Sequence, residues 1–277
     1  IFQDSASLSA FQSQQLFLLI TAVLIVLGAI SYPVVAEFMR RRRPNRWALD
    51  TRLVLIGTVG LWALAALSLL AFLGAGYTHE EGRHAGRVAG AIEWLIGQQQ
   101  ANGFLGGRAT RYARHYCHAM ASYALAEALG MQNDKTRNPQ LRRAVERGVA
   151  YILSQQNLVD GGWRYVKDQR SDMSMFGWQL MALKSAEIAG LDVPQRSKDL
   201  MIKFLNDRSL GRFKGLAAYR VVEPPLPVSP AMTAEALFSK QMLGIRRNHP
   251  ACGEAIGFLS ERLPRLSQTD LYCWYYG

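Results

Sequence analysis

Two long uncharged segments set the first part of the chain apart from the rest. Residues 16–35 and 53–73 are runs of 20 and 21 residues without a charged side chain. An α-helix rises about 1.5 Å per residue, so about 20 apolar residues cross the hydrocarbon core of a bilayer. The pattern predicts a membrane anchor over residues 1–77, with two transmembrane helices at about 16–35 and 53–73.

The loop between the two predicted spans, residues 36–52, is rich in arginine. Its arginines are Arg40, Arg41, Arg42, Arg43, Arg46 and Arg52. Short loops of this composition stay on the cytoplasmic side of a membrane. The chain after the second span is therefore predicted to lie outside the cytoplasm, in the periplasm of a Gram-negative-type cell. A nucleic-acid patch is the competing interpretation, but a cluster between two spans meets anionic lipid headgroups rather than a duplex.

From residue 78 onward, apolar residues recur three and four positions apart, which predicts helices. Two kinds of segment alternate with a period of about 54–60 residues. One kind carries an aromatic anchor, at Trp94, Tyr151, Phe204 or Phe258. The other is rich in small residues and ends at Gly130, Gly190 or Gly244, where a helix C-cap is expected. The predicted fold is all-α, with three and a half stacked helix hairpins over residues 78–277.

The second repeat carries a motif in which a basic and a small residue precede an aromatic residue, a glutamine and a Gly-x-Trp turn. Its residues are Arg147, Gly148, Tyr151, Gln156, Gly161 and Trp163. This pattern is similar to the QW motif of the squalene cyclase and protein prenyltransferase repeat superfamily. The first repeat resembles it through Trp94, Gln99 and Gly103, with Leu105 in place of the tryptophan. The resemblance covers roughly residues 84–277.

The resemblance implies an α/α toroid of inner and outer helices around a cavity, which receives isoprenoid chains in characterised relatives. The visible repeats are too few to close a ring, so an incomplete toroid is expected. The chain begins with Ile1 and ends on an aromatic run, which favours a piece of a longer bacterial-type protein. The glutamine of the motif can satisfy backbone groups at a helix end, and the tryptophan can cover it. The motif therefore indicates a fold rather than a reaction.

The acidic and metal-binding signatures of the superfamily are missing from this sequence. Triterpene cyclases protonate their substrate with a D-x-D-D motif, and the nearest analogue here is Asp172 followed by Ser174. Protein prenyltransferases bind zinc through D-x-C, and Ser174 and Tyr272 occupy the place of that cysteine. Asp172 is left as the candidate catalytic acid. His115 and His118 share a helix face but lack a third ligand, so neither a metal site nor a cofactor is predicted.

Four aromatic residues are candidates for the lining of a cavity. Phe176 and Trp178 begin a predicted inner helix, and Tyr272 and Trp274 lie near the end of the chain. Ring faces can line an apolar cavity or stabilise a carbocation. Ordinary core packing is the alternative interpretation for the same residues.

The charge of the chain argues against a nucleic-acid partner. The net charge is +11, of which residues 1–77 contribute six basic and three acidic residues as a topology signal. The remaining charge is spread over the repeats, as on a solvated face beside an anionic membrane. Three cysteines are too few for a disulfide scaffold.

Three functions stay open at this point. The first is a non-catalytic repeat protein, anchored to a lipid bilayer, that binds an isoprenoid, another apolar ligand or a protein partner. The second is an isoprenoid-converting enzyme of the terpene cyclase or prenyltransferase type, with its site at Asp172 or in missing repeats. The third is a carbohydrate-active enzyme, which would need paired carboxylates facing the cavity.

Overall fold

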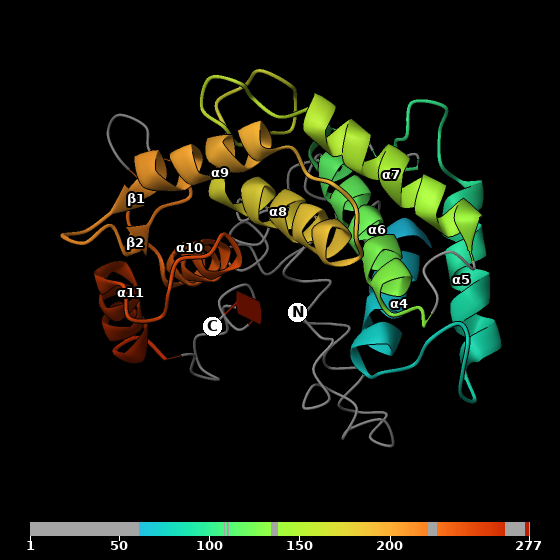
Figure 1. The fold of residues 1–277 in the computed structure, drawn as a ribbon. Coiled ribbons are helices and arrows are strands. Elements are labelled where there is room, and N and C mark those ends of the chain that lie inside the picture. Colours follow the sequence, from blue (N-terminus) through green and yellow to red (C-terminus); the bar gives the residue numbers. More distant parts are fainter. Residues whose placement is uncertain are drawn as a thin grey trace, which may run out of the picture. The chain divides into compact units, whose positions relative to one another are not determined.

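The computed structural model describes residues 61–107, 109, 111–133, 138–220, 226–263 and 275–276. These residues form eight helices and one two-stranded hairpin (Figure 1). The helices are α4 (Leu61–Gly74), α5 (Ala85–Gly97), α6 (Arg111–Gly130), α7 (Pro139–Ser154), α8 (Met173–Ile188), α9 (Gln195–Arg208), α10 (Pro230–Met242) and α11 (Pro250–Ser260). The strands are β1 (Ser209–Leu210) and β2 (Leu216–Ala217). The sequence analysis predicted an all-α fold; this part of the chain is mostly helical, with one short hairpin in addition.

The described residues divide into two compact units. Unit 1 holds residues 61–154 and 181–193, and unit 2 holds residues 155–180 and those described from 194 onward. Helices α4 to α7 belong to unit 1, whereas the hairpin, α9, α10 and α11 belong to unit 2. Helix α8 begins in unit 2 and ends in unit 1.

Helix α6 forms the core of unit 1 and packs against α4 and α7 (Figure 1). Its alanines Ala119, Ala124 and Ala128 are completely buried. Small side chains on several faces allow neighbouring helices to approach from more than one side. Helix α7 instead buries one stripe, which includes Val145 and Ile152, and leaves charged residues on its outer face. The small-residue segment that forms α6 is therefore buried on several sides, whereas the amphipathic segment that forms α7 keeps one face exposed.

Part of the second predicted span lies within the described residues. Residues 61–73 form most of α4, in which Leu67, Leu69 and Leu73 are buried. Within the described ranges, no helix combines the length and the apolar character needed to cross a bilayer. The first uncharged run, the arginine-rich loop 36–52 and the start of the second run lie outside those ranges. The two spans therefore remain a prediction.

Two of the three predicted helix C-caps have the left-handed backbone that favours glycine. Gly190 follows α8 with a φ of 88°, and Gly244 follows α10 with a φ of 96°. The N–H of Leu191 then donates to the Ala186 carbonyl at 3.0 Å, and the N–H of Ile245 donates to the Lys240 carbonyl at 2.9 Å. These bonds close both helices in the same way. The prediction is confirmed at both glycines.

The hairpin between α9 and α10 is a feature of unit 2 that the apolar pattern did not predict. Its strands are antiparallel, with Ser209 opposite Ala217 and Leu210 opposite Leu216. Strands of two residues are too short to show an alternating pattern. The turn contains Lys214, which has a φ of 61°, an uncommon backbone conformation for a residue other than glycine.

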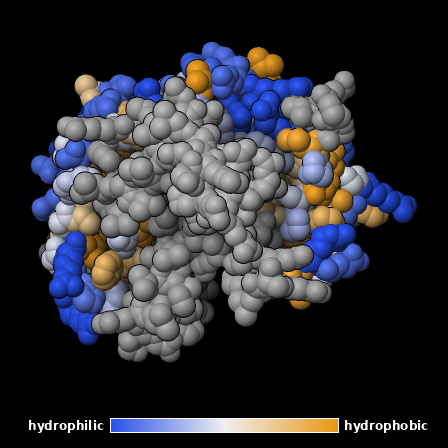
Figure 2. Space-filling model, turned by 180° about the vertical axis from the view of Figure 1, so that it is seen from behind, coloured by the Kyte–Doolittle hydropathy of each residue, from blue (hydrophilic) through white to orange (hydrophobic). Residues whose placement is uncertain are grey.

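The described surface carries its polar residues in several separate areas. Figure 2 shows hydrophilic residues over different parts of the described surface, with hydrophobic residues between them. The most exposed large hydrophobic residues are Leu158, Val159, Val166 and Leu263.

Candidate functional site

The first conspicuous turn lies between α5 and α6 and binds to α7. The side-chain amide of Gln99 donates to the Gly103 carbonyl at 3.0 Å and to the Ala144 carbonyl of α7 at 2.9 Å. Gly103 has a φ of 88°, and a Cβ there would lie 2.3 Å from the Arg147 carbonyl oxygen. The Arg147 guanidinium donates to the Gln100 carbonyl at 2.6 Å. The basic residue of the motif therefore holds the preceding turn.

The second turn repeats this arrangement with the residues of the full motif. The side-chain amide of Gln156 donates to the Gly161 carbonyl at 2.9 Å and to the Ser197 carbonyl of α9 at 3.3 Å. The Ser197 hydroxyl donates back to the Gln156 amide oxygen at 2.7 Å. Gly161 has a φ of 85°, and a Cβ there would lie 2.0 Å from the Leu200 carbonyl oxygen. Each of the two glutamines thus joins its own turn to a later helix of the chain, Gln99 to α7 and Gln156 to α9.

The third turn, in the hairpin, also contacts a later helix of the chain, but through a carboxylate instead of a glutamine amide. Gly211 has a φ of 89° and approaches the carboxylate of Glu254 in α11. That carboxylate accepts the backbone N–H groups of Arg212 at 2.7 Å, Phe213 at 3.0 Å and Gly215 at 2.7 Å. Burial acts to raise the pKa of Glu254, but these three N–H groups together bring it below its ordinary value. A charged side chain from the next helix here replaces the glutamine of the turn.

His118 connects the first turn with the motif glycine in unit 1. Its Nδ1 accepts the Leu105 N–H at 2.9 Å, and its Nε2 lies 3.2 Å from the Gly148 carbonyl oxygen. Since Nδ1 accepts, the ring is neutral and carries its proton on Nε2. Burial lowers the pKa of His118 to about 3, and the positive charge of Arg114 acts in the same direction. The ring of Tyr151 lies edge-on to His118, with the centroids 4.6 Å apart.

Acidification should destabilise unit 1 through His118. The unfolded chain binds a proton at this residue near pH 6.5, whereas the folded chain does so only near pH 3. The contribution of neutral His118 to the free energy of unfolding is therefore fully present above pH 6.5 and is lost as the pH falls toward 3. Between pH 7 and pH 5 this amounts to about 2 kcal/mol of unfolding free energy. Urea unfolding at both pH values should show a smaller pH dependence for His118→Gln than for the wild type, and an equal dependence would contradict the assignment.

Cys117 stands between His115 and His118 in α6 and is buried. Burial raises the pKa of the Cys117 thiol to about 12, so the thiolate that binds metals is not formed at neutral pH. Among the residues that the structure describes, no three His, Cys, Asp or Glu side chains lie close enough to bind a metal ion.

The predicted cavity residues that fall within the described ranges lie in packed surroundings. Phe176 is completely buried between Trp163 and Phe204, with ring centroids at 6.0 Å and 4.5 Å. Trp178 is also completely buried and stacks on Tyr275 at 5.7 Å. Tyr272 and Trp274 lie outside the described residues. Core packing accounts for the positions of Phe176 and Trp178.

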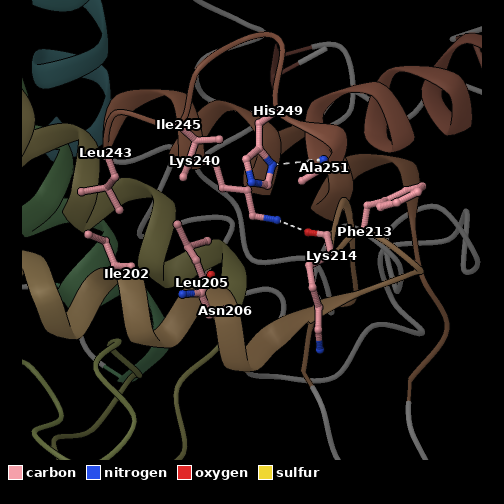
Figure 3. A pocket seen from close by; sticks show the side chains of 10 residues that line it. All are labelled: Ile202, Leu205, Asn206, Phe213, Lys214, Lys240, Leu243, Ile245, His249 and Ala251. Carbon is pink, nitrogen blue, oxygen red and sulfur yellow. Dashed lines mark hydrogen bonds between the residues drawn. The ribbon is translucent and has the colours of Figure 1, made fainter.

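A pocket of about 270 Å³ lies elsewhere in unit 2 (Figure 3). Helix α9 contributes Ile202 and Leu205, and the segment between α10 and α11 contributes Leu243 and Ile245. The hairpin turn and the helix ends add Phe213, Lys240 and His249. This volume is near the lower end of those of small-molecule sites. None of these residues is among the site residues predicted from the sequence.

Asp172 is the N-cap of α8. One carboxylate oxygen accepts the Met175 N–H and the Ser174 hydroxyl, each at 2.9 Å. Aspartate at this position satisfies a free N–H group of the first helical turn and favours the positive end of the helix dipole. The side chain is completely buried. N-capping of α8 is therefore sufficient to account for an aspartate at this position.

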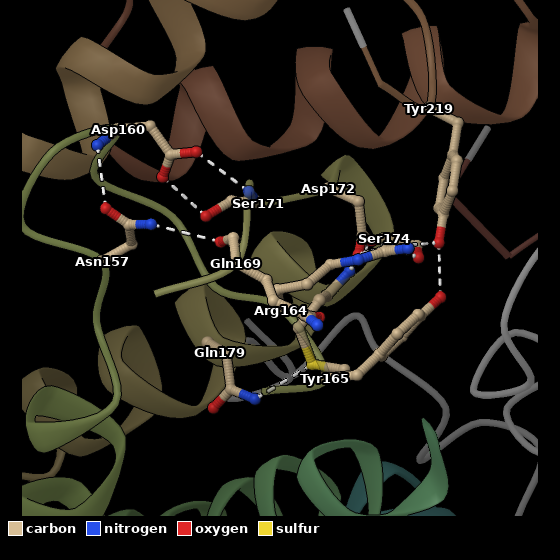
Figure 4. Close-up of polar contacts among 11 residues, drawn as sticks. Asn157, Asp160, Arg164, Tyr165, Gln169, Ser171, Asp172, Ser174, Gln179 and Tyr219 are labelled. Atoms are coloured by element: carbon tan, nitrogen blue, oxygen red, sulfur yellow. Dashed lines mark hydrogen bonds and ion pairs between the residues drawn. The ribbon is translucent and has the colours of Figure 1, made fainter. Parts of the chain in front are cut away.

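The second carboxylate oxygen of Asp172 pairs with the guanidinium of Arg164 (Figure 4). Arg164 also donates to the Tyr219 hydroxyl at 2.7 Å and lies 3.9 Å above the ring of Tyr165. The hydroxyls of the two tyrosines are hydrogen-bonded to each other. We call these four residues the Asp172 cluster. Of the four, Asp172 alone is among the site residues predicted from the sequence.

The electrostatics of the Asp172 cluster follow from its burial. Burial raises the pKa of the Asp172 carboxyl, and Arg164, the Met175 N–H and the Ser174 hydroxyl oppose that increase. Burial lowers the pKa of Arg164, but the Asp172 charge and the two phenols raise it above its ordinary value overall. Burial and the Asp172 charge raise the pKa of Tyr219. Burial thus acts against the charge on Asp172, and the neighbouring Arg164 guanidinium acts in its favour.

Comparison with known proteins identifies no family for this chain. No family model, curated protein or solved structure matches the chain.

Proposed function

We propose that this chain is a non-catalytic, ligand-binding helical repeat protein of the squalene cyclase and protein prenyltransferase type. The repeated turn supports this type, because Gln99 and Gln156 make equivalent bonds to their own turn and to the next outer helix. The alternation of buried inner helices with amphipathic outer helices also fits an α/α toroid. With the repeats at hand, that toroid would be an incomplete ring.

The complete burial of Asp172 is the main support for the proposal that the chain is non-catalytic. An acid that protonates a hydrocarbon must hold a proton and reach its substrate. Asp172 has no exposed surface, and both of its oxygens are bound by protein groups. The pocket in unit 2 is lined by other residues. Its apolar walls favour the binding of a ligand over the partner-binding alternative.

The two predicted spans complete the proposal. An anchor over residues 1–77, with its arginine-rich loop in the cytoplasm, would hold the repeats outside the cytoplasm beside the bilayer. An apolar or amphipathic ligand dissolved in or near the membrane would then be close to the pocket.

Incubation with isoprenoid substrates tests this proposal. The 277-residue chain, held in phosphatidylcholine nanodiscs, would be incubated separately with squalene and with farnesyl diphosphate. We expect no product above the protein-free blank by mass spectrometry, while a triterpene cyclase run in parallel converts its squalene. Conversion by the wild type that disappears in a folded Asp172→Asn variant would overturn the proposal in favour of an enzyme.

A further inference from the structure

A buried lysine stands out in the unit 2 pocket. Lys240 lies near the C-terminal end of α10 and has only 6% of its surface exposed. Its ammonium group donates a hydrogen bond to the backbone carbonyl of Lys214 in the hairpin turn (Figure 3). An ammonium group carries three donors, so this carbonyl leaves donor capacity within the pocket. Burying an amine in apolar surroundings costs free energy unless a hydrogen-bond acceptor or an opposite charge pairs with it.

Lys240 also departs from the pattern of its own repeats. The two earlier inner helices have alanine at the equivalent position, Ala126 in α6 and Ala186 in α8, and both are completely buried. The carbonyls of Ala186 and Lys240 accept the same C-capping bond, which fixes the equivalence of the two positions. A charged residue in place of a buried small one breaks the local rule of the fold, and such departures concentrate at functional sites.

The charged groups around Lys240 leave the pocket positive. Glu254 is the nearby acid, and its carboxylate already accepts three backbone N–H groups of the hairpin turn. The other neighbours are the Lys214 side chain and the Cys252 thiol. His249 caps α11, since its Nδ1 accepts the Ala251 N–H at 3.2 Å. A negative group would therefore find a favourable place beside Lys240.

We infer that this pocket binds an organic anion with a short apolar chain, whose carboxylate or phosphate pairs with the amine of Lys240. The chain would pack on Leu205, Leu243 and Ile245 and cover Ile202 and Phe213, which are 38% and 46% exposed. Burial lowers the pKa of Lys240 in the empty pocket, and a bound anion would raise it again. The inference rests on the proposed ligand-binding role and names its ligand class.

Calorimetric titration of the 277-residue chain in phosphatidylcholine nanodiscs tests this inference. Octanoate is the probe, and octanamide is its neutral counterpart. We expect octanoate to bind the wild type roughly tenfold or more tightly than octanamide, because a charge-assisted hydrogen bond contributes only with the anion. This comparison needs no variant. Equal affinities for the two probes, or no binding of octanoate, would overturn the inference.

Two variants test whether Lys240 provides the positive charge that binds octanoate. Lys240→Met keeps the apolar stem and should weaken octanoate binding roughly tenfold or more. Lys203→Met removes an exposed lysine of α9 that pairs with Asp207, and should leave the affinity unchanged. Equal octanoate binding by a folded Lys240→Met and the wild type would also overturn the inference. Whether isoprenoids are converted is measured independently, so a failed titration and an observed conversion refute different statements.

The same acid group can come from a free acid or from a membrane lipid. Nanodiscs in which phosphatidic acid replaces part of the phosphatidylcholine separate the two sources. Octanoate binding that weakens in these discs for the wild type, but not for Lys240→Met, would assign the lipid headgroup as an occupant. Binding that is independent of the phosphatidic acid would assign a free acid. Both results support an anion at Lys240.

Discussion

A Gly161→Ala variant should lose about 3 kcal/mol or more of its free energy of unfolding. Two effects add at this position. The φ of 85° is strained for alanine, and the new Cβ would lie 2.0 Å from the Leu200 carbonyl oxygen. That oxygen belongs to the backbone of α9, so it cannot move without shifting the helix. The variant should separate the turn from the next outer helix, and urea unfolding measures the loss.

Gly244→Ala is the matched control in the same unit. Gly244 has a φ of 96°, and a Cβ there would meet no atom within 4 Å. Alanine at this site should lower the free energy of unfolding only through the strained backbone, by about 1 kcal/mol. Equal losses at Gly161 and Gly244 would show that the close approach of the turn to α9 contributes nothing to stability.

The helices and their order could be predicted because they depend on local signals. Apolar spacing predicted the helical segments, and the left-handed glycines Gly190 and Gly244 follow the ends of α8 and α10 as predicted. The motif predicted that Gln156 would satisfy free backbone groups at a helix end. Gln156 does bind backbone carbonyls, but the one in α9 belongs to the first helical turn, where the N–H groups and not the carbonyls are unsatisfied. These features need only residues that are near in sequence or that repeat.

The Asp172 cluster and the pocket could not be predicted, because they depend on which loop residues, distant in sequence, meet in the folded chain. Arg164 lies eight positions before Asp172, in a loop with no regular period, and Tyr219 lies 55 positions after Arg164. The spacing gives no reason for these side chains to meet. One signal for the pocket was available: alignment of the inner helices places Lys240 where Ala126 and Ala186 stand.

An Arg164→Met variant should lose about 3–5 kcal/mol of its free energy of unfolding. Methionine fills much of the same space but leaves the completely buried Asp172 carboxylate without its cation and removes the donor to Tyr219. Lys203→Met breaks the exposed pair with Asp207 and should cost less than about 1 kcal/mol. Comparable losses for the two variants, measured by urea unfolding, would contradict a structural role for the buried pair.

The most direct test of the central claim is a double-mutant cycle on this ion pair. Asp172→Asn keeps an oxygen that can cap α8 but removes the charge, and combined with Arg164→Met it leaves no unpaired charge in the cluster. If Asp172 serves the fold, the double variant should lose less unfolding free energy than the sum of the two single variants, by about 2 kcal/mol or more. Additive losses, equal to the sum within about 0.5 kcal/mol, would contradict the claim.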